Sequence, residues 1–101
     1  MKTAKEIKEL REEHCKNVQS EARTAALQWI AERAADIENT LVLGEKTYYD
    51  LYYEGKVDDP LSNATRQWIA AELGALGYTV LFYDETTIGH KKQLYRVRIE
   101  L

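Results

Sequence analysis

The residues of this chain that could do chemistry are few and scattered. The two histidines are His14, in a run of charged residues, and His90, in a polar stretch near the end. His14 precedes the single cysteine, Cys15. Adjacent residues on a helix point about 100° apart, so these two side chains are not placed as a base and a nucleophile. The pair therefore predicts no active site.

Metal and phosphate sites also lack support in the sequence. A zinc site needs three or four converging ligands, and neither a Cys-x-x-Cys nor a His-x-x-x-His spacing occurs. Asp84, Glu85 and His90 flank one loop, which is too little to predict a metal site. The five glycines are scattered, so no glycine-rich phosphate loop follows a strand. We expect a non-enzymatic protein that needs no cofactor and no metal.

Composition indicates an ordinary globular domain. The 101 residues have room for one domain, 1–101, and the hydrophobic fraction of 45% excludes a disordered chain. The net charge of −3 is too acidic for a protein that wraps duplex DNA and too mild for a DNA mimic. A single cysteine cannot form an internal disulfide, and no signal peptide or membrane-length apolar run occurs. We expect a cytoplasmic protein without membrane contact.

A long helix is predicted at the N-terminus. No Gly or Pro occurs before Gly44, and Thr3 with Glu6 fits a capping box. Apolar residues then recur every three or four positions. About 36 helical residues would span roughly 54 Å, whereas a compact chain of this size has a radius of gyration near 13 Å. The helix therefore either bends near 17–20, or its first part, 1–20, projects and pairs with another chain. In the second case Ile7, Leu10 and Val18 are the predicted oligomerisation residues.

The rest of the chain predicts three strands and a second helix. An aromatic run at 47–53 indicates a strand, and 54–56 a turn. Asp58, Asp59 and Pro60 open a second helix that ends at Gly77 in a Schellman motif. Two strands follow at 78–83 and 94–101, joined by the polar loop 84–92. The predicted fold class is α+β: a long N-terminal helix, then strand–helix–strand–strand, forming a three-stranded, mainly antiparallel sheet. The second helix is predicted to bury Leu61, Trp68, Ile69, Leu73 and Leu76.

A short internal repeat complicates the end of the first helix. Gln28-Trp29-Ile30-Ala31 recurs as Gln67-Trp68-Ile69-Ala70, and a threonine followed by apolar residues comes eleven or twelve positions after each copy. A duplicated helix–strand unit would make 40–43 a strand. Coincidence between two amphipathic helices explains the repeat as well, and we prefer it.

One face of the predicted sheet carries the most plausible binding residues. Alternation places Tyr49, Leu51, Tyr53, Val80, Phe82, Val97 and Ile99 on the buried face. The opposite face, here called the Tyr/Arg face, then carries Tyr48, Asp50, Tyr52, Thr79, Leu81, Tyr83, Arg96 and Arg98. Tyrosine and arginine are enriched at interface hot spots, and they also stack on bases and pair with phosphate. The predicted binding residues are Tyr48, Tyr52, Tyr83, Arg96 and Arg98, with His90, Lys91 and Lys92 in the neighbouring basic loop.

Three interpretations of the Tyr/Arg face stay open at this point. The long helix could lie across it, so that the tyrosines are packing residues with wet hydroxyls. It could be a protein interface, or it could bind a nucleotide or single-stranded nucleic acid. The segment 86–101 carries four basic residues against Glu100 alone, a local charge of +3.

The layout as a whole resembles a set of short proteins encoded by tailed bacteriophages, mostly of unassigned function. The matching residues are Ala4-Lys5-Glu6, Gly44-Glu45, Leu73-x-x-Leu76-Gly77-Tyr78-x-Val80 and Tyr95-x-Val97-x-Ile99. The match covers most of the chain, although these are structural positions. The resemblance implies small proteins that act by stoichiometric binding in the host cytoplasm, without catalytic residues.

We therefore expect an interaction protein that inhibits a host or anti-phage defence factor by binding it, and that forms a homo-oligomer. One alternative is a nucleotide or single-stranded nucleic-acid binder that uses the Tyr/Arg face. The other is a structural subunit of a virion or a similar assembly.

Overall fold

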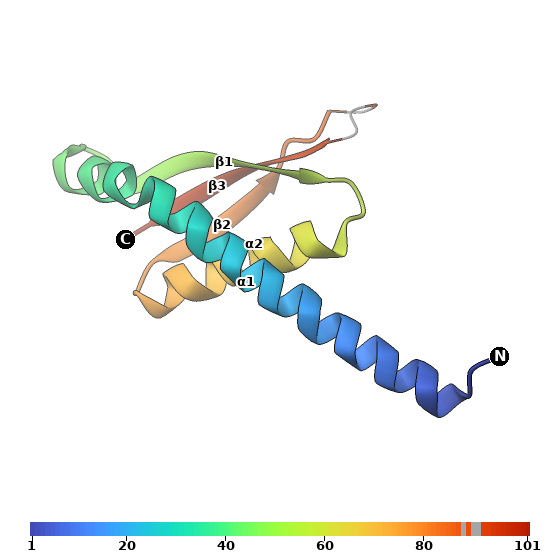
Figure 1. Cartoon of the computed structure of the whole chain (residues 1–101). Helices are drawn as coiled ribbons and strands as arrows, with labels where there is room; N and C mark the ends of the chain where they lie inside the picture. The colour runs from blue at the N-terminus through green and yellow to red at the C-terminus, as the bar shows by residue number, and fades with distance from the viewer. Residues whose placement is uncertain (88, 90–91) are drawn as a thin grey trace.

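The computed structural model describes residues 1–87, 89 and 92–101. The elements are α1 (Ala4–Leu43), β1 (Tyr48–Lys56), α2 (Pro60–Ala75), β2 (Thr79–Asp84) and β3 (Lys92–Glu100). Figure 1 shows α1 and α2 crossing on the same side of one three-stranded sheet. The predicted α+β class, element order and antiparallel sheet are confirmed. The turn predicted at 54–56 is wrong, because β1 continues to Lys56.

The sheet has the order β1-β3-β2, and the last strand of the chain is its centre. β3 pairs antiparallel with both neighbours, so that Asp50 and Leu81 both lie opposite Arg98. β1 and β2 are consequently parallel to each other, and α2 is the crossover that connects them. This order makes β1 and β2 the two edges of the sheet.

The core lies between the helices and one sheet face. Val97 and Ile99 in the central strand are fully buried, as is Ile69 of α2. Trp29 and Ile37 of α1 belong to the same cluster of buried residues. The inward residues predicted for the strands pack against the same cluster, as alternation requires: Tyr49, Leu51, Tyr53, Val80 and Phe82.

The first helix runs without interruption from Ala4 to Leu43, so the bend considered near 17–20 does not occur. Thr3 is the N-cap and accepts a hydrogen bond from the Glu6 amide at 3.2 Å, as the capping box predicts. The helix ends where Gly44 donates to the Thr40 carbonyl at 2.9 Å. A Cβ on Gly44 would collide with that carbonyl oxygen, which explains the glycine. Residues 40–43 are helical, so the strand expected from duplication is wrong.

The second helix begins and ends as predicted. The Asp59 carboxylate accepts from the Leu61 amide at 3.3 Å and from the Ser62 hydroxyl at 3.0 Å. At the other end, Tyr78 donates to the Leu73 carbonyl and Gly77, at φ 96°, donates to that of Gly74. These two bonds form the Schellman motif.

Burial in α2 differs from the prediction at its C-terminal end. Ile69 and Leu73 are buried, and Trp68 is half-buried. Leu76, which was predicted to be buried, is 72% exposed, because it is the C-cap residue that follows the last helical residue.

The N-terminal part of α1 extends beyond the rest of the fold (Figure 1). All residues from Met1 to Asn17 are exposed, and Ala22 is the first buried residue of the helix. Contacts with α2 begin where Gln19 accepts from the Trp68 indole at 2.8 Å. The radius of gyration is consequently 16.5 Å and the longest extent 61 Å. We call residues 1–17 the projecting segment.

Neither described helix combines the length and the apolar character that a membrane-spanning helix needs.

Candidate functional site: a tyrosine–arginine sheet face

The Tyr/Arg face is built by strand alternation on the side of the sheet that faces away from the helices. Register brings its members into rows across the three strands. In one row Tyr52, Arg96 and Tyr83 are neighbours, and in the next Asp50, Arg98 and Leu81. The interpretation in which α1 covers this face is therefore not the arrangement found, since α1 packs on the opposite face.

A carboxylate on β1 binds the two arginines of β3. Asp50 accepts two hydrogen bonds from Arg98, at 2.8 and 3.0 Å, and one from Arg96 at 3.4 Å. Arg96 also donates to Glu85 at 2.8 Å. The two parallel bonds from Arg98 to Asp50 fix the plane of that guanidinium, and Arg96 is held between two carboxylates, Asp50 and Glu85. The two positive charges are thus matched by two negative charges within the face.

The tyrosine rings stack against these guanidinium groups. The Arg98 guanidinium carbon lies 4.1 Å from the Tyr48 ring centroid, and that of Arg96 lies 4.4 Å from the Tyr83 centroid. Arg98 also approaches Tyr83, at 5.8 Å. Cation–π contacts at these distances stabilise the order Tyr48, Arg98, Tyr83, Arg96 across the face. The face is therefore preorganised without a ligand.

Exposure decides which of these residues a partner can contact. Tyr52 is 53% exposed and Tyr83 37%, next to Leu81 at 38%. Tyr48, Arg96 and Arg98 are half-buried by their neighbours. The most accessible large side chains of the face are therefore Tyr52, Tyr83 and Leu81. They surround Arg96 and Arg98, which we call the arginine centre.

Electrostatics within the face follow from these contacts. The hydrogen bond from Arg98 is the largest cause that lowers the pKa of Asp50 below its usual value of 3.8, and Arg96 adds to it. The same bond raises the pKa of Arg98, and the bond to Glu85 raises that of Arg96. Asp50, Arg96 and Arg98 consequently stay charged at neutral pH.

The basic loop is only partly within the described chain. His90 and Lys91 lie outside the described residues. Lys92 begins β3 and shares the face of Arg96 and Arg98 by alternation, about 13 Å along the strand from Arg96. Its ammonium lies 3.9 Å from the Glu54 carboxylate, and its side chain is 76% exposed. Lys92 is thus at the far end of the face from Tyr48.

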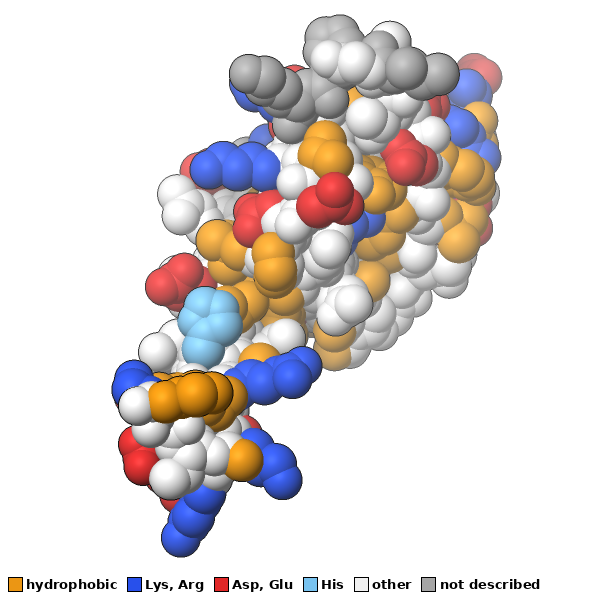
Figure 2. Space-filling view, turned by 90° about the vertical axis from the view of Figure 1, so that its right-hand side faces the viewer, with side chains coloured by type: hydrophobic (Ala, Val, Ile, Leu, Met, Phe, Trp, Pro, Cys, Tyr) orange, Lys and Arg blue, Asp and Glu red, His pale blue; other side chains and the backbone are white. Residues whose placement is uncertain are grey.

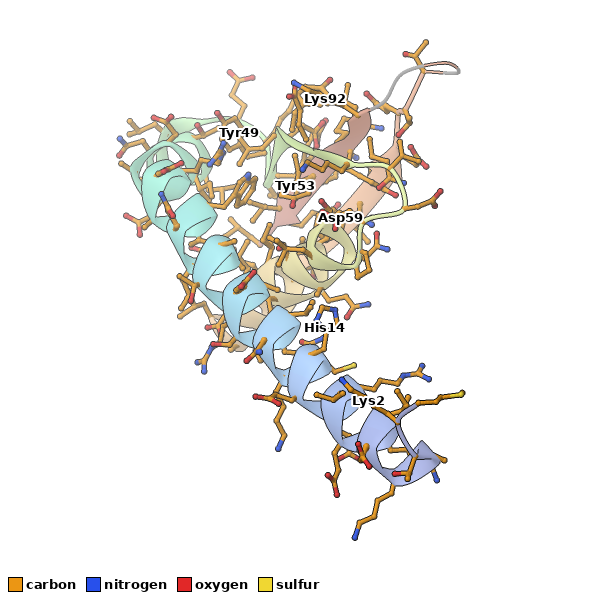
Figure 3. All side chains as sticks on the ribbon, turned by 45° about the vertical axis from the view of Figure 1, so that its right-hand side comes forward. Lys2, His14, Tyr49, Tyr53, Asp59 and Lys92 are labelled. Carbon is orange, nitrogen blue, oxygen red and sulfur yellow. The ribbon has the colours of Figure 1, made fainter. Side chains whose placement is uncertain are left out.

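The predicted oligomerisation residues lie on the projecting segment or at its end. Ile7 and Leu10 are 52% and 45% exposed, and Val18 is half-buried where the contact with α2 begins. Figure 2 shows apolar side chains between charged ones on this end of the molecule, with the imidazole beside them. Figure 3 places His14 on the same segment and Tyr49 and Tyr53 between β1 and α1. Cys15 is a free, exposed thiol.

Two residues of the Tyr/Arg face, Asp50 and Glu85, were not among the predicted binding residues. Asp50 was placed on the correct face, but only the register with Arg98 makes it the residue that organises the face. Glu85 was considered only as a loop residue. Alternation could indicate the face of a residue but not its cross-strand neighbour. Within the described ranges, no group of three histidine, cysteine, aspartate or glutamate side chains could hold a metal ion.

No protein-family model, curated protein or solved structure matches the chain.

Proposed function

We propose that this protein acts by stoichiometric binding to a protein partner, which it contacts through the Tyr/Arg face. The observation that carries the proposal is a sheet face turned away from both helices, with Tyr52 and Tyr83 exposed around arginines that are already held in place. Rigid aromatic and arginine side chains lose little entropy on binding, which is typical of interface hot spots.

Charge balance favours a protein partner over a phosphate ligand. Arg96 and Arg98 are paired with Asp50 and Glu85, so the centre of the face is close to neutral. A phosphate would have to compete with two carboxylates for the same guanidinium groups. A neutral protein surface with hydroxyl and carbonyl groups meets no such competition.

The resemblance to short phage proteins extends this proposal to the class of partner. A host protein or an anti-phage defence factor in the bacterial cytoplasm would be blocked when the face covers its working surface. An exposed thiol such as that of Cys15 suits a reducing compartment.

The test compares three immobilised forms of the chain in bacterial lysate: wild type, the double variant Tyr52→Ala with Tyr83→Ala, and a control, Val42→Ala with Leu76→Ala. The control side chains are more exposed than the two tyrosines, and they lie at helix ends, away from the Tyr/Arg face. The proposal predicts that wild type and control retain the same protein from the lysate. Calorimetry should then show that the affinity of this protein for the tyrosine variant is lowered at least about 30-fold. Equal retention by all three forms would contradict it.

A second candidate, nucleotide or single-strand binding, is favoured by the exposed ring of Tyr52 beside Arg96. It predicts binding to a nucleotide panel at low salt that weakens as salt rises. Absence of binding at low salt would remove it.

A further inference from the structure

The two edge strands of the sheet differ in how many charged residues they carry. Edge strands expose unpaired backbone groups, and charged residues usually protect them. β1 carries Asp50, Glu54 and Lys56, and the Lys56 amide is bound by the Ser62 hydroxyl at 3.2 Å. β2 runs Thr79-Val80-Leu81-Phe82-Tyr83 without a charge or a proline before Asp84. In the described part of the chain, β2 pairs on one side only, with β3.

The register identifies which backbone groups of β2 face outward. The Glu85 amide donates to the Leu94 carbonyl at 2.8 Å, and these residues are opposite in the same register as the rest of the strand pair. Hydrogen-bonded and non-hydrogen-bonded pairs alternate in an antiparallel ladder. Tyr83, Leu81 and Thr79 therefore bond to β3. The amide and carbonyl groups of Val80 and Phe82 point to the free edge.

From this edge we infer that two copies of the chain pair through antiparallel β2 strands, with Leu81 opposite Leu81 at the two-fold axis. The run 79–83 is suited to pairing with itself. Val80 of one copy lies opposite Phe82 of the other, and Thr79 opposite Tyr83. The outward amide and carbonyl groups of Val80 and Phe82 then meet those of the second copy, which gives four backbone hydrogen bonds around the axis.

The space beside β2 fits the side chains of such a strand. A groove of about 370 Å³ opens between the strand and α2, lined by Asn63, Arg66, Gln67, Ala70 and Phe82. A two-fold axis perpendicular to the sheet keeps each face on its own side, so Val80 and Phe82 of the second copy enter on the helix side, beside this groove. Apolar side chains would fill the space next to Phe82 of the first copy.

Pairing would also extend the Tyr/Arg face. Leu81 and Tyr83 are on that face and partly exposed, at 38% and 37%. In the pair, the two Leu81 side chains contact each other, and each Tyr83 covers Thr79 of the other copy. The result is one six-stranded sheet with two arginine centres side by side. This inference does not depend on the proposed partner binding.

The experiment measures mass in solution by light scattering for the wild type, Leu81→Lys, Leu81→Glu and a one-to-one mixture of the two variants. Leu81 faces solvent in the single chain, so both variants should fold, as circular dichroism can verify. Like charges directly opposite each other should return each variant to a monomer, and opposite charges in the mixture should restore the dimer. Ile7→Lys with Leu10→Lys is the control, and it should remain a dimer.

A thiol cross-link tests the register. In a Cys15→Ser background, Leu81→Cys should form an intermolecular disulfide on mild oxidation, because Cα atoms in a non-hydrogen-bonded pair lie about 4.5 Å apart. Thr79→Cys should not, since its opposite residue is Tyr83. A monomeric wild type, a Leu81→Lys dimer, a monomeric mixture of the charged variants, or equal cross-linking at both positions would overturn the inference.

Discussion

At the scale of single residues, Asp50 has the largest effect on the Tyr/Arg face. Within the described contacts, its carboxylate is the only acceptor of hydrogen bonds from both Arg96 and Arg98. Without it, Arg98 would keep its stacking on Tyr48 but lose both hydrogen bonds. The geometry of the face therefore depends on a residue that a partner would contact little.

Asp50→Asn should lower the free energy of unfolding by about 1–3 kcal/mol at neutral pH, because hydrogen bonds between charged groups are replaced by weaker ones. Chemical denaturation measures this value. Glu13→Gln on the projecting segment is the control and should have no effect, since Glu13 is exposed. A loss no larger than that of the control would contradict the role given to Asp50.

The same variant predicts a pH dependence. Because the pKa of Asp50 is lowered in the folded protein, its stabilisation is fully present above the usual value of 3.8 and is lost as pH falls through the lowered pKa. The difference in unfolding free energy between wild type and Asp50→Asn should stay constant from pH 7 to about 5 and shrink only below 3.8. A difference that shrinks near pH 6 would contradict this assignment.

Substituting alanine for each of two glycines at the C-terminal end of α2 should change the stability of the protein in opposite directions. Gly77 has φ 96°, which costs an L-residue about 1 kcal/mol, so Gly77→Ala should destabilise the protein. Gly74 lies within the helix with open space at its Cβ, so Gly74→Ala should stabilise it by about 0.5–1 kcal/mol. Thermal unfolding under identical conditions compares them. Effects of the same sign would contradict the C-cap geometry.

At the scale of elements, α1 has two parts with different physical support. From Ala22 onward it is held by the core, whereas the described side-chain contacts within residues 1–17 are those of the capping box alone. An isolated helix of this length is marginal in water. The association through Ile7, Leu10 and Val18 that the sequence predicts would stabilise it further only at concentrations above those at which the Leu81→Lys variant is monomeric.

Amide hydrogen exchange should separate the two parts. In a dilute sample, amides of residues 7–17 should exchange at least about tenfold faster than those of residues 26–41, because local opening of the exposed part breaks no tertiary contact. Raising the protein concentration should slow exchange of residues 7–17 if Ile7 and Leu10 form a seam between copies. Equal protection of both parts in dilute solution would contradict the projecting arrangement.

At the scale of the whole molecule, shape is the property that differs most from expectation for a compact chain. A domain of this length has a radius of gyration near 13 Å. The value here is 16.5 Å, and the difference comes from the projecting segment (Figure 1).

Small-angle scattering of the Leu81→Lys variant, which we expect to be monomeric, should give a radius of gyration of at least 16.5 Å and a longest dimension of at least 61 Å. Hydration adds to both values. A radius near 13 Å would mean that α1 folds back on the domain, and it would contradict the straight helix.

The type and order of the elements, the caps of both helices and the two faces of the sheet could be predicted from local sequence patterns. Thr3, Asp59 and Gly77 act through hydrogen bonds and dihedral angles within a few residues, so their roles can be predicted without tertiary contacts. Alternation in β3 likewise separates Val97 from Arg96 and Arg98, because the period of two is a property of the strand itself.

Strand order, register and the covered parts of the helices could not be predicted in this way, because they depend on contacts between distant segments. The pairing of Asp50 with Arg98 joins residues 48 positions apart, and a register shifted by one residue would have put Tyr49 or Leu51 opposite Arg98 instead. Three other features also depend on how whole elements are arranged. They are the exposure of Leu76, the helical state of residues 40–43 and the free edge at β2. Local sequence patterns do not predict these features. The strand order and register are selected by the free energy of burying the apolar faces of both helices and of the sheet together.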